Sequence, residues 1–479
     1  MKKTTKRAIS MCVVVALIAG LAGLYFLRPA ETEADEEAPV TAATFLIERE
    51  ESDVARVRFI SQDDDFVMTP YETDQGILWQ YQPNPDFLLN PVRARDKVRS
   101  GWHLTMMDIV HEDAGSVDVA DFGFDPPLLT MEVTYTDGTS QTIYFGAQTA
   151  DMRHRFARLS GSDAIYTIGN MTAQWAMADV ANLIERGLMP FTAEAEYMLI
   201  AQRDTPTIEL TLDSEWEAAD AMAALVPGTP QMPMLHLIQP IDRAVDPSRL
   251  TARVLEPLEH FRLGDVVSLT PANLADYGLD VPSLEFVYRD MFGEVHLLLG
   301  DTFIEDVGGA EVEFIYVKFA DRPHVFRAEF LPISGLFNLN IFTFIDRFIA
   351  LPNIVTVDGI TITSPVEARN FGMVINHVGE SDIAPTINGV PIDAADFRVA
   401  YRLLIALMME GEIEPFTPEG VADVTIVYHR PEEPDIEIRL FAMGSHLYAV
   451  SVDGADAWFV THGRDVDVFF GHVTALMAG

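Results

Sequence analysis

The sequence predicts an α+β protein with three consecutive repeats of an antiparallel sheet plus helices, placed after a single N-terminal transmembrane helix. Residues 120–127 (ADFGFDPP) return as residues 275–282 (ADYGLDVP) with five of eight positions identical, and each copy precedes two apolar runs typical of a β-hairpin. Residues 8–27 contain no charged side chain. The length of 479 residues, 49% of them hydrophobic, suffices for about three domains with filled cores.

The N-terminal segment is expected to anchor the chain in the lipid bilayer. Residues 8–27 are long enough to cross the hydrocarbon at about 1.5 Å per residue. Basic residues precede this run and acidic residues follow it, so the positive-inside bias predicts a cytoplasmic N-terminus, with tip and anchor together spanning residues 1–28. The sequence therefore predicts a single-pass protein of the cell membrane whose bulk is extracytoplasmic.

Two alternatives for the N-terminus stay open at this point. Residues 20–22 could be a signal-peptide cleavage site, but apolar residues continue to Leu27, which favours an uncleaved anchor. Cys12 could carry a lipid, but it stands near the start of the apolar run, which a lipidated cysteine should close. Since Cys12 is the only cysteine, the exported part can form no disulfide and no thiolate metal site.

The charge distribution bears on the partners. Residues 29–44 are expected to form an acidic linker that like charges keep extended. Five of the 32 basic residues lie within the first 28 positions, which leaves 27 basic against 73 acidic residues in the remainder. Such a surface repels phosphate backbones and anionic lipid heads, so we expect no nucleic-acid partner. It would favour cationic partners or bound cations, and the simpler explanation is that the charge keeps the protein soluble.

The first repeat is expected to span residues 45–190. A strand and a hairpin come first, followed by an amphipathic helix that begins at a proline, the glycine corner with its hairpin, a second hairpin and a closing helix. These elements are expected over residues 54–60, 66–79, 91–112, 129–146, 156–168 and 172–188.

The second and third repeats are expected to follow the same order over residues 191–348 and 349–479. The second ends in a closing helix, and Asp246 caps its first one. The third is shorter, and its corner has degenerated to residues 418–423. Helices are expected over residues 247–261, 393–409 and 465–477.

The repeated corner is expected to be structural. Glycine reaches backbone angles closed to other residues, aspartate bonds back to nearby amides, and proline blocks helix extension before the strand. The corner residues are Gly123, Asp125, Pro127, Gly278, Asp280 and Pro282.

These features resemble the domain of unknown function 4340 (DUF4340) family over most of residues 45–345, and more weakly over the third repeat. The resemblance rests on the Gly-[Phe/Leu]-Asp-x-Pro corner and on two later pairs of strands. It implies a bacterial protein with one membrane anchor and repeated outward-facing domains, often associated with gliding-motility-type or related ABC transport systems. It implies no catalytic residue. The strand pairs contain Phe145-Gly146 with Leu299-Gly300, and Ile165-Tyr166 with Val325-Phe326.

The sequence offers only weak candidates for a catalytic or metal site, and we expect no catalytic residue, cofactor or metal. No Gly-x-Ser-x-Gly, phosphate-loop or His-Glu-x-x-His motif occurs. Three acidic clusters lack the spacing of a calcium loop and are expected to be solvated turns. The candidates are His103 with His111, Asp108 with His111, Ser445 with His446, Ser160 with Asp163, and the acidic clusters of residues 63–65, of Asp301, Glu305 and Asp306, and of Glu432, Glu433 and Asp435.

The most apolar exported segment covers residues 336–351. As a helix it would be apolar on more than one face, so something must cover it. Packing between the second and third repeats is one explanation, and docking onto a membrane partner is the other. The candidate partner surface consists of Leu336, Phe337, Ile341, Phe342, Phe344 and Phe348.

The sequence thus favours a non-enzymatic, membrane-anchored extracytoplasmic binding or scaffold protein. Its place would be as an accessory component of an ABC-type transport or envelope system, with a membrane-protein or envelope partner. The alternative is an exported metal-dependent hydrolase that uses the acidic clusters. Three or more of the named acids or histidines within about 4 to 6 Å of one another would favour the hydrolase.

Overall fold

The computed structural model describes residues 44–74, 76–191, 195–213, 234–379, 382–444 and 446–478. The expected anchor over residues 8–27 lies outside the described residues, as does the expected linker up to residue 43. Within the described part of the chain, no helix is both long enough and apolar enough to cross a membrane.

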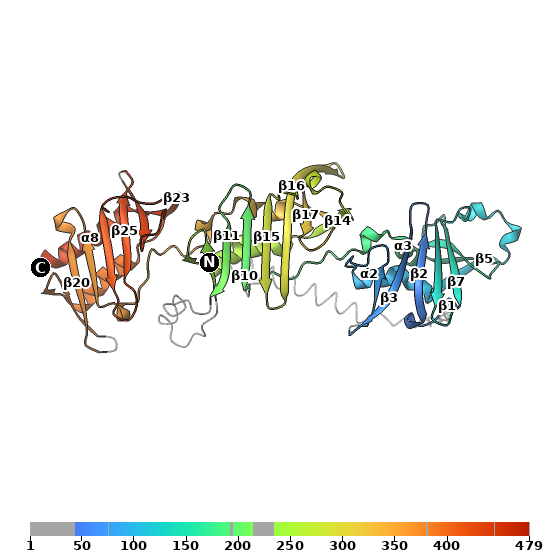
Figure 1. Cartoon of the computed structure of the whole chain (residues 1–479), viewed down its shortest axis with the longest axis horizontal. Helices are drawn as coiled ribbons and strands as arrows, with labels where there is room; N and C mark the ends of the chain where they lie inside the picture. The colour runs from blue at the N-terminus through green and yellow to red at the C-terminus, as the bar shows by residue number, and fades with distance from the viewer. Residues whose placement is uncertain are drawn as a thin grey trace, which may run out of the picture. The chain divides into compact units, whose positions relative to one another are not determined.

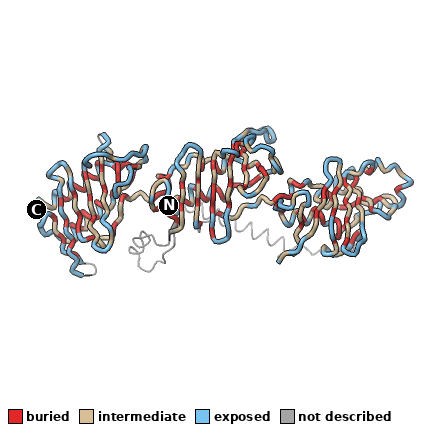
Figure 2. Tube along the Cα trace, in the orientation of Figure 1, coloured by how far each residue is buried: buried red, intermediate tan, exposed pale blue. Residues whose placement is uncertain are grey.

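The chain divides into two compact units, Met1–Asp179 and Val180–Gly479. The first unit contains one nine-stranded sheet, and the second contains two (Figure 1). In all three sheets the paired strands are antiparallel, and helices are few, so the fold is α+β as predicted. Figure 2 shows buried residues along the strands and exposed residues at the connecting loops.

The first sheet has the order β1-β5-β9-β8-β7-β6-β2-β3-β4. Its central strands alternate in burial: Leu129, Met131 and Val133 of β6 face the core, and the residues between them are half-buried. The strands are β1 (Thr44–Glu48), β2 (Val54–Ile60), β3 (Asp65–Thr73), β4 (Gly76–Tyr81), β5 (His103–His111), β6 (Leu129–Tyr135), β7 (Ser140–Gln148), β8 (His154–Leu159) and β9 (Ile165–Gly169).

The second sheet has the order β13-β12-β11-β10-β15-β16-β17-β18-β14. One hairpin, β16 with β17, is longer than its neighbours and runs on past the rest of the sheet. The strands are β10 (Tyr197–Gln202), β11 (Ile208–Asp213), β12 (Met234–Gln239), β13 (Arg243–Ala244), β14 (Leu263–Ser268), β15 (Leu284–Asp290), β16 (Gly293–Val307), β17 (Ala310–Phe319) and β18 (Val325–Glu329).

The third sheet has the order β22-β21-β20-β19-β24-β25-β26-β27-β23. The strands are β19 (Gly359–Thr363), β20 (Phe371–His377), β21 (Ile383–Ile387), β22 (Val390–Pro391), β23 (Gly411–Phe416), β24 (Val424–His429), β25 (Ile436–Ala442), β26 (Leu447–Val452) and β27 (Ala457–His462).

The three sheets share one order of eight strands. Read from β4, β12 and β21, each order begins with three strands and continues with four strands that are consecutive in the sequence. It ends at the strand that directly precedes those four in the sequence. That last strand is β5, β14 or β23, and each one pairs with the final strand of its sheet through an irregular register. The order is the same although the third corner has lost its sequence motif.

Each sheet has a helix that starts at a side-chain cap directly after the first strands. Asn90, Asp246 and Asp393 accept hydrogen bonds from backbone amides of the first helical turn, which satisfies donors that would otherwise be unpaired. The helices are α2 (Pro91–Val98), α5 (Pro247–Leu250) continued by a π-helical turn into α6 (Glu256–His260), and α7 (Ala394–Ile405). The later helices α3 (Asn170–Met177) and α8 (Gly463–Ala478) pack on α2 and α7.

Two predicted helices are wrong, and a third, expected over residues 172–188, ends at Met177 and is followed by a separate 3-10 helix over Val180–Leu183. The helix expected over residues 91–112 ends at Val98, and strand β5 follows it. A side chain at Gly101 would lie 3.2 Å from Val133, so the chain crosses close to the sheet there before it extends between β1 and β9. The closing helix expected in the second repeat is replaced by two 3-10 helices, Leu331–Asn338 and Ile341–Thr343.

Candidate functional site

The two repeated corners have the same backbone geometry. In each, a 3-10 helix ends at a glycine in the left-handed region, Gly123 with φ +74° and Gly278 with φ +65°. The side chains of Asp118 and Asn273 cap these 3-10 helices by accepting from the amides of Ala120 and Ala275. The caps therefore come from residues ahead of the motif, whereas Asp125 and Asp280, which the sequence suggested for this role, are exposed.

Each corner packs closely against the second strand of the hairpin that follows it. A side chain at Gly123 would lie 2.6 Å from the amide nitrogen of Ala147. On the facing strand, a side chain at Gly146 would collide with the Phe122 carbonyl, and one at Gly300 with the Tyr277 carbonyl. The two glycines of each copy therefore form one close backbone contact, and the motif acts in packing.

The third corner lacks this contact for a reason visible in the backbone. The same hydrogen bond joins the start of the hairpin to its second strand in all three copies, at 2.8–3.0 Å. These bonds run from Leu128 to Phe145, from Ser283 to Leu299 and from Asp423 to Leu440. By this alignment Phe441 stands where Gly146 and Gly300 stand, so no close approach is possible there. A side chain at Gly420 would meet nothing within 4 Å.

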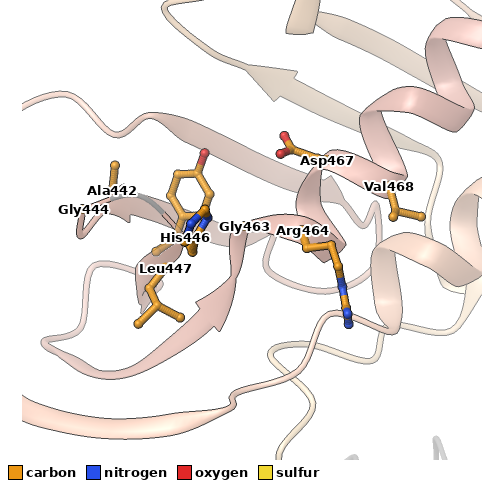
Figure 3. Close-up of a pocket in the computed structure, with 9 residues that line it drawn as sticks. Ala442, Gly444, His446, Leu447, Gly463, Arg464, Asp467 and Val468 are labelled. Atoms are coloured by element: carbon orange, nitrogen blue, oxygen red, sulfur yellow. The ribbon is translucent and has the colours of Figure 1, made fainter.

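One pocket of about 430 Å³ lies in the third sheet, between the β25–β26 turn and the first turn of α8 (Figure 3). Its charged side chains are already engaged: Asp467 accepts from Arg369 at 2.8 Å, and Arg464 donates to Asp465 at 3.1 Å. Figure 3 shows Arg464 and Asp467 pointing in different directions. His446 lines the pocket, but Ser445, its suggested partner, lies outside the described residues.

The acidic clusters do not come together. Asp65 accepts two hydrogen bonds from Arg58, at 2.6 and 2.8 Å, and these bonds lower the pKa of Asp65. Asp435 accepts from the Arg430 amide and from His429, which lowers its pKa. Asp65 and Asp435 therefore stabilise turns. Among the described residues, no group of three or more His, Cys, Asp or Glu is placed to hold a metal.

The remaining sequence candidates are also separated or structural. His103 and His111 occupy opposite ends of β5, so the helical face suggested for His111 and Asp108 does not exist. The Ser160 hydroxyl accepts from the Thr142 amide at 2.9 Å, and the Asp163 carbonyl accepts from Ala114. The pair of residues 160 and 163 thus stabilises a hairpin connection.

The apolar segment is largely covered within the second unit. Of the suggested partner surface, Leu336, Ile341 and Phe344 are buried, and Phe337, Phe342 and Phe348 are half-buried. The segment therefore does not offer these six side chains as one open surface.

The covering comes from both sheets of the second unit. Ile345 forms a β-bridge with Val245, and Phe348 forms one with Met408. The Phe342 ring lies 6.0 Å from that of Phe459. Burial lowers the pKa of Arg243, which donates to the carbonyl oxygen of Phe348. Residues 341–349, which we name the connecting segment, are thus held along their length.

Lys97 is a buried cation that sequence reasoning did not find. Its side chain is 2% exposed, and its Nζ donates to the carbonyls of Ala176 at 2.8 Å and Ala178 at 2.6 Å. The amine lies 4.2 Å from the centre of the Phe59 ring. Burial lowers its pKa to about 7, against the opposing pull of nearby carboxylates. Lys97 therefore satisfies the C-terminal carbonyls of α3, where a cation is favourable.

A sequence signal for Lys97 did exist. Ala94, Lys97 and Val98 share the spacing of one helix face, and all three are buried. A lysine on an apolar helix face is usually a long side chain that reaches solvent. Only the position of α3, whose Ala176 lies 79 residues further along the chain, shows that the Lys97 side chain does not reach solvent.

Comparison with known proteins gives one match. No curated protein and no solved structure matches this chain. A family model matches one stretch of the chain, which contains both corners, with Gly123 and Gly278, and ends at Pro282. The resemblance predicted from the sequence is therefore confirmed: residues 79–282 match the family model described as Domain of unknown function (DUF4340).

Proposed function

We propose that this chain is a membrane-anchored, extracytoplasmic scaffold or binding protein, an accessory component of an ABC-type transport or envelope system. The observation that carries the proposal is the strand order shared by three sheets in one chain. Repetition of one unit builds extended surface for partners without requiring a catalytic centre. The second sheet and the third would then be further copies of the unit that the first sheet forms.

The motif residues support a scaffold because they act in packing. The corner glycines close a backbone contact, Lys97 caps a helix, and Arg243 holds the connecting segment. What distinguishes the chain chemically is its formal charge of −41, which attracts cationic protein surfaces over distances of about a Debye length.

The membrane assignment rests on the uncharged run over residues 8–27 with basic residues before it and acidic residues after it. A reporter enzyme that is active only outside the cytoplasm, fused after Gly479, tests the orientation. We expect activity from the full chain. Activity from a cytoplasmic reporter at the same position would contradict the proposal.

The partner is tested by extracting the full chain from its native membrane in mild detergent and identifying proteins that co-purify in fixed proportion. We expect membrane subunits of a transporter or envelope complex. The matched control is another acidic single-span protein extracted in the same detergent, which should not retain them. Recovery of the chain alone under several detergents would overturn the proposal.

A further inference from the structure

The hairpin β16–β17 extends beyond the length of its counterparts. β16 has 15 residues and β17 has 10, whereas β7 and β8 have nine and six, and β25 and β26 have seven and six. A register shift between Leu299 and Thr302 separates the part inside the sheet from the part beyond it. We name residues 302–315 the arm.

The base of the arm is rigid. The Phe303 ring stacks on Tyr316 at 4.4 Å and on Phe314 at 5.7 Å, and Tyr277 of the corner packs edge-on against Tyr316. Arg327 lies 5.0 Å from the centre of the Phe314 ring and also bonds Glu305. Aromatic pairs of this kind fix geometry as well as bury area. One face of the arm is therefore occupied by the protein itself.

Beyond its base, where Ile315 is buried, the opposite face of the arm is exposed and carries an unusual set of side chains. Ile304 is 66% exposed and pairs directly across the hairpin with Glu313, while Asp306 pairs directly across with Glu311. Residues that pair directly project to the same face, so three carboxylates surround one exposed isoleucine. Residues 301–316 contain five acidic side chains and no basic one.

The carboxylates of this face repel one another, although Asp306 also accepts from the Gly309 amide at 2.7 Å and so stabilises the turn. Like charges directly opposite each other destabilise a hairpin, and the Asp306–Glu311 pair lies next to a third carboxylate. An exposed isoleucine in such a setting contributes nothing to the core. Both costs would be removed by one partner that supplies cations at the rim and an apolar contact at the centre.

From these side chains we propose that the arm docks, through Ile304 and the carboxylates of Asp306, Glu311 and Glu313, onto a protein surface where Lys or Arg side chains surround an apolar hollow. Charge complementarity selects this occupant. Nucleic acids and anionic lipid heads would be repelled, and so would the same face on a second copy of this chain. The inference rests on the scaffold function proposed above and names the surface that serves it.

The test places a photo-crosslinking amino acid at position 304 of the full chain in its native membrane. The matched control carries it at Met152, which is 71% exposed in the shorter counterpart turn between β7 and β8. We expect an adduct from position 304 and none from position 152. Mass spectrometry should place the adduct next to Lys or Arg residues of another protein.

The charges are tested in the same crosslinking strain. Glu311→Lys with Glu313→Lys should reduce the adduct roughly tenfold, and 0.5 M salt should reduce it in the same direction. The milder pair Glu311→Gln with Glu313→Gln should give an intermediate yield, and unchanged thermal melting shows that each variant folds.

Three outcomes overturn the proposal: no adduct at position 304, an adduct with a second copy of this chain, or an adduct that charge reversal leaves unchanged. Each is distinct from failure of the scaffold function. If partners still co-purify while position 304 gives no adduct, the scaffold stands and the arm does not serve it. If nothing co-purifies, the scaffold function itself fails.

Discussion

Lys97 links the pH dependence of stability to one buried amine. Its folded-state pKa is about 7, below the ordinary value of 10.5, so between these values the unfolded chain binds more protons than the folded chain. The free energy of unfolding must therefore rise with pH across this window. The cause is burial, which disfavours the charged amine.

We expect the first unit to gain about 2 kcal/mol in unfolding free energy between pH 7 and pH 9 from this group alone. Urea titrations of the full chain at both pH values measure the gain. Lys97→Met should flatten the pH dependence because it removes the titrating amine. An equal pH dependence in the wild-type chain and this variant would show that Lys97 is not the group responsible.

Gly300 tests the contact between a corner and its hairpin. Gly300→Ala should destabilise the second unit by about 2–4 kcal/mol, because the new side chain would enter the Tyr277 carbonyl and force the backbone apart. Denaturant unfolding followed by fluorescence measures the loss.

The matched control for this substitution is Gly471→Ala in α8, where a new side chain would meet nothing within 4 Å. There the substitution should stabilise the helix by about 0.5–1 kcal/mol. If both alanine variants have the same stability, the close contact at the corner does not contribute to the free energy of unfolding.

Repetition made Gly123 and Gly278 visible in the sequence, and the residue type then indicated their backbone conformation. Gly146 and Gly300 were visible only as the ends of strands. Glycine is required at these two positions because of a carbonyl more than twenty positions earlier in the chain, and no local pattern shows that contact. Lys97 was missed for the same reason, because its environment is made by α3.

Strand β5 shows why an element can be misassigned while the fold class is correct. Residues 91–112 place apolar side chains at spacings that also suit a helix, and α2 does begin at Pro91 as predicted. Beyond Gly101, pairing with β1 and β9 determines the conformation. Tertiary pairing outweighs local periodicity for short segments of this kind.

The connecting segment depends on Arg243 in a way that can be measured. Arg243→Met should lower the unfolding free energy of the second unit by about 1–3 kcal/mol, because the carbonyl of Phe348 loses its donor. Hydrogen exchange should quicken at the amides of Ile349 and Met409, which bond Leu407 and Arg347. Arg253→Met, at an exposed position of the π-helical turn, should change neither quantity appreciably.

The division into two compact units predicts how the chain unfolds. Calorimetry should resolve at least two transitions, because each unit has its own core. Lys97→Met should shift only the transition of the first unit, and Gly300→Ala only that of the second. A single transition shifted by both substitutions would show that the chain unfolds as one cooperative body.

The sequence predicted the α+β class and the DUF4340 resemblance because both depend on local patterns that recur. The sequence pattern did not reveal the arm, because a run of acidic residues does not show whether it forms a solvated turn or the end of a longer hairpin. Asp301, Glu305 and Asp306 were noted as an acidic cluster, yet cross-strand pairing places only Asp306 beside Glu311, while Glu305 pairs with Val312 on the other face.

The shared strand order also constrains how the protein can be made. In the second sheet and the third, β14 and β23 pair, among the described strands, only with the last strand, β18 or β27. As a ribosome releases the chain from its N-terminus, β14 must wait for residues 325–329 before it can pair. A nascent chain stalled before that point would expose the unpaired edge of β14, and the same holds for β23 until residues 457–462 have been made.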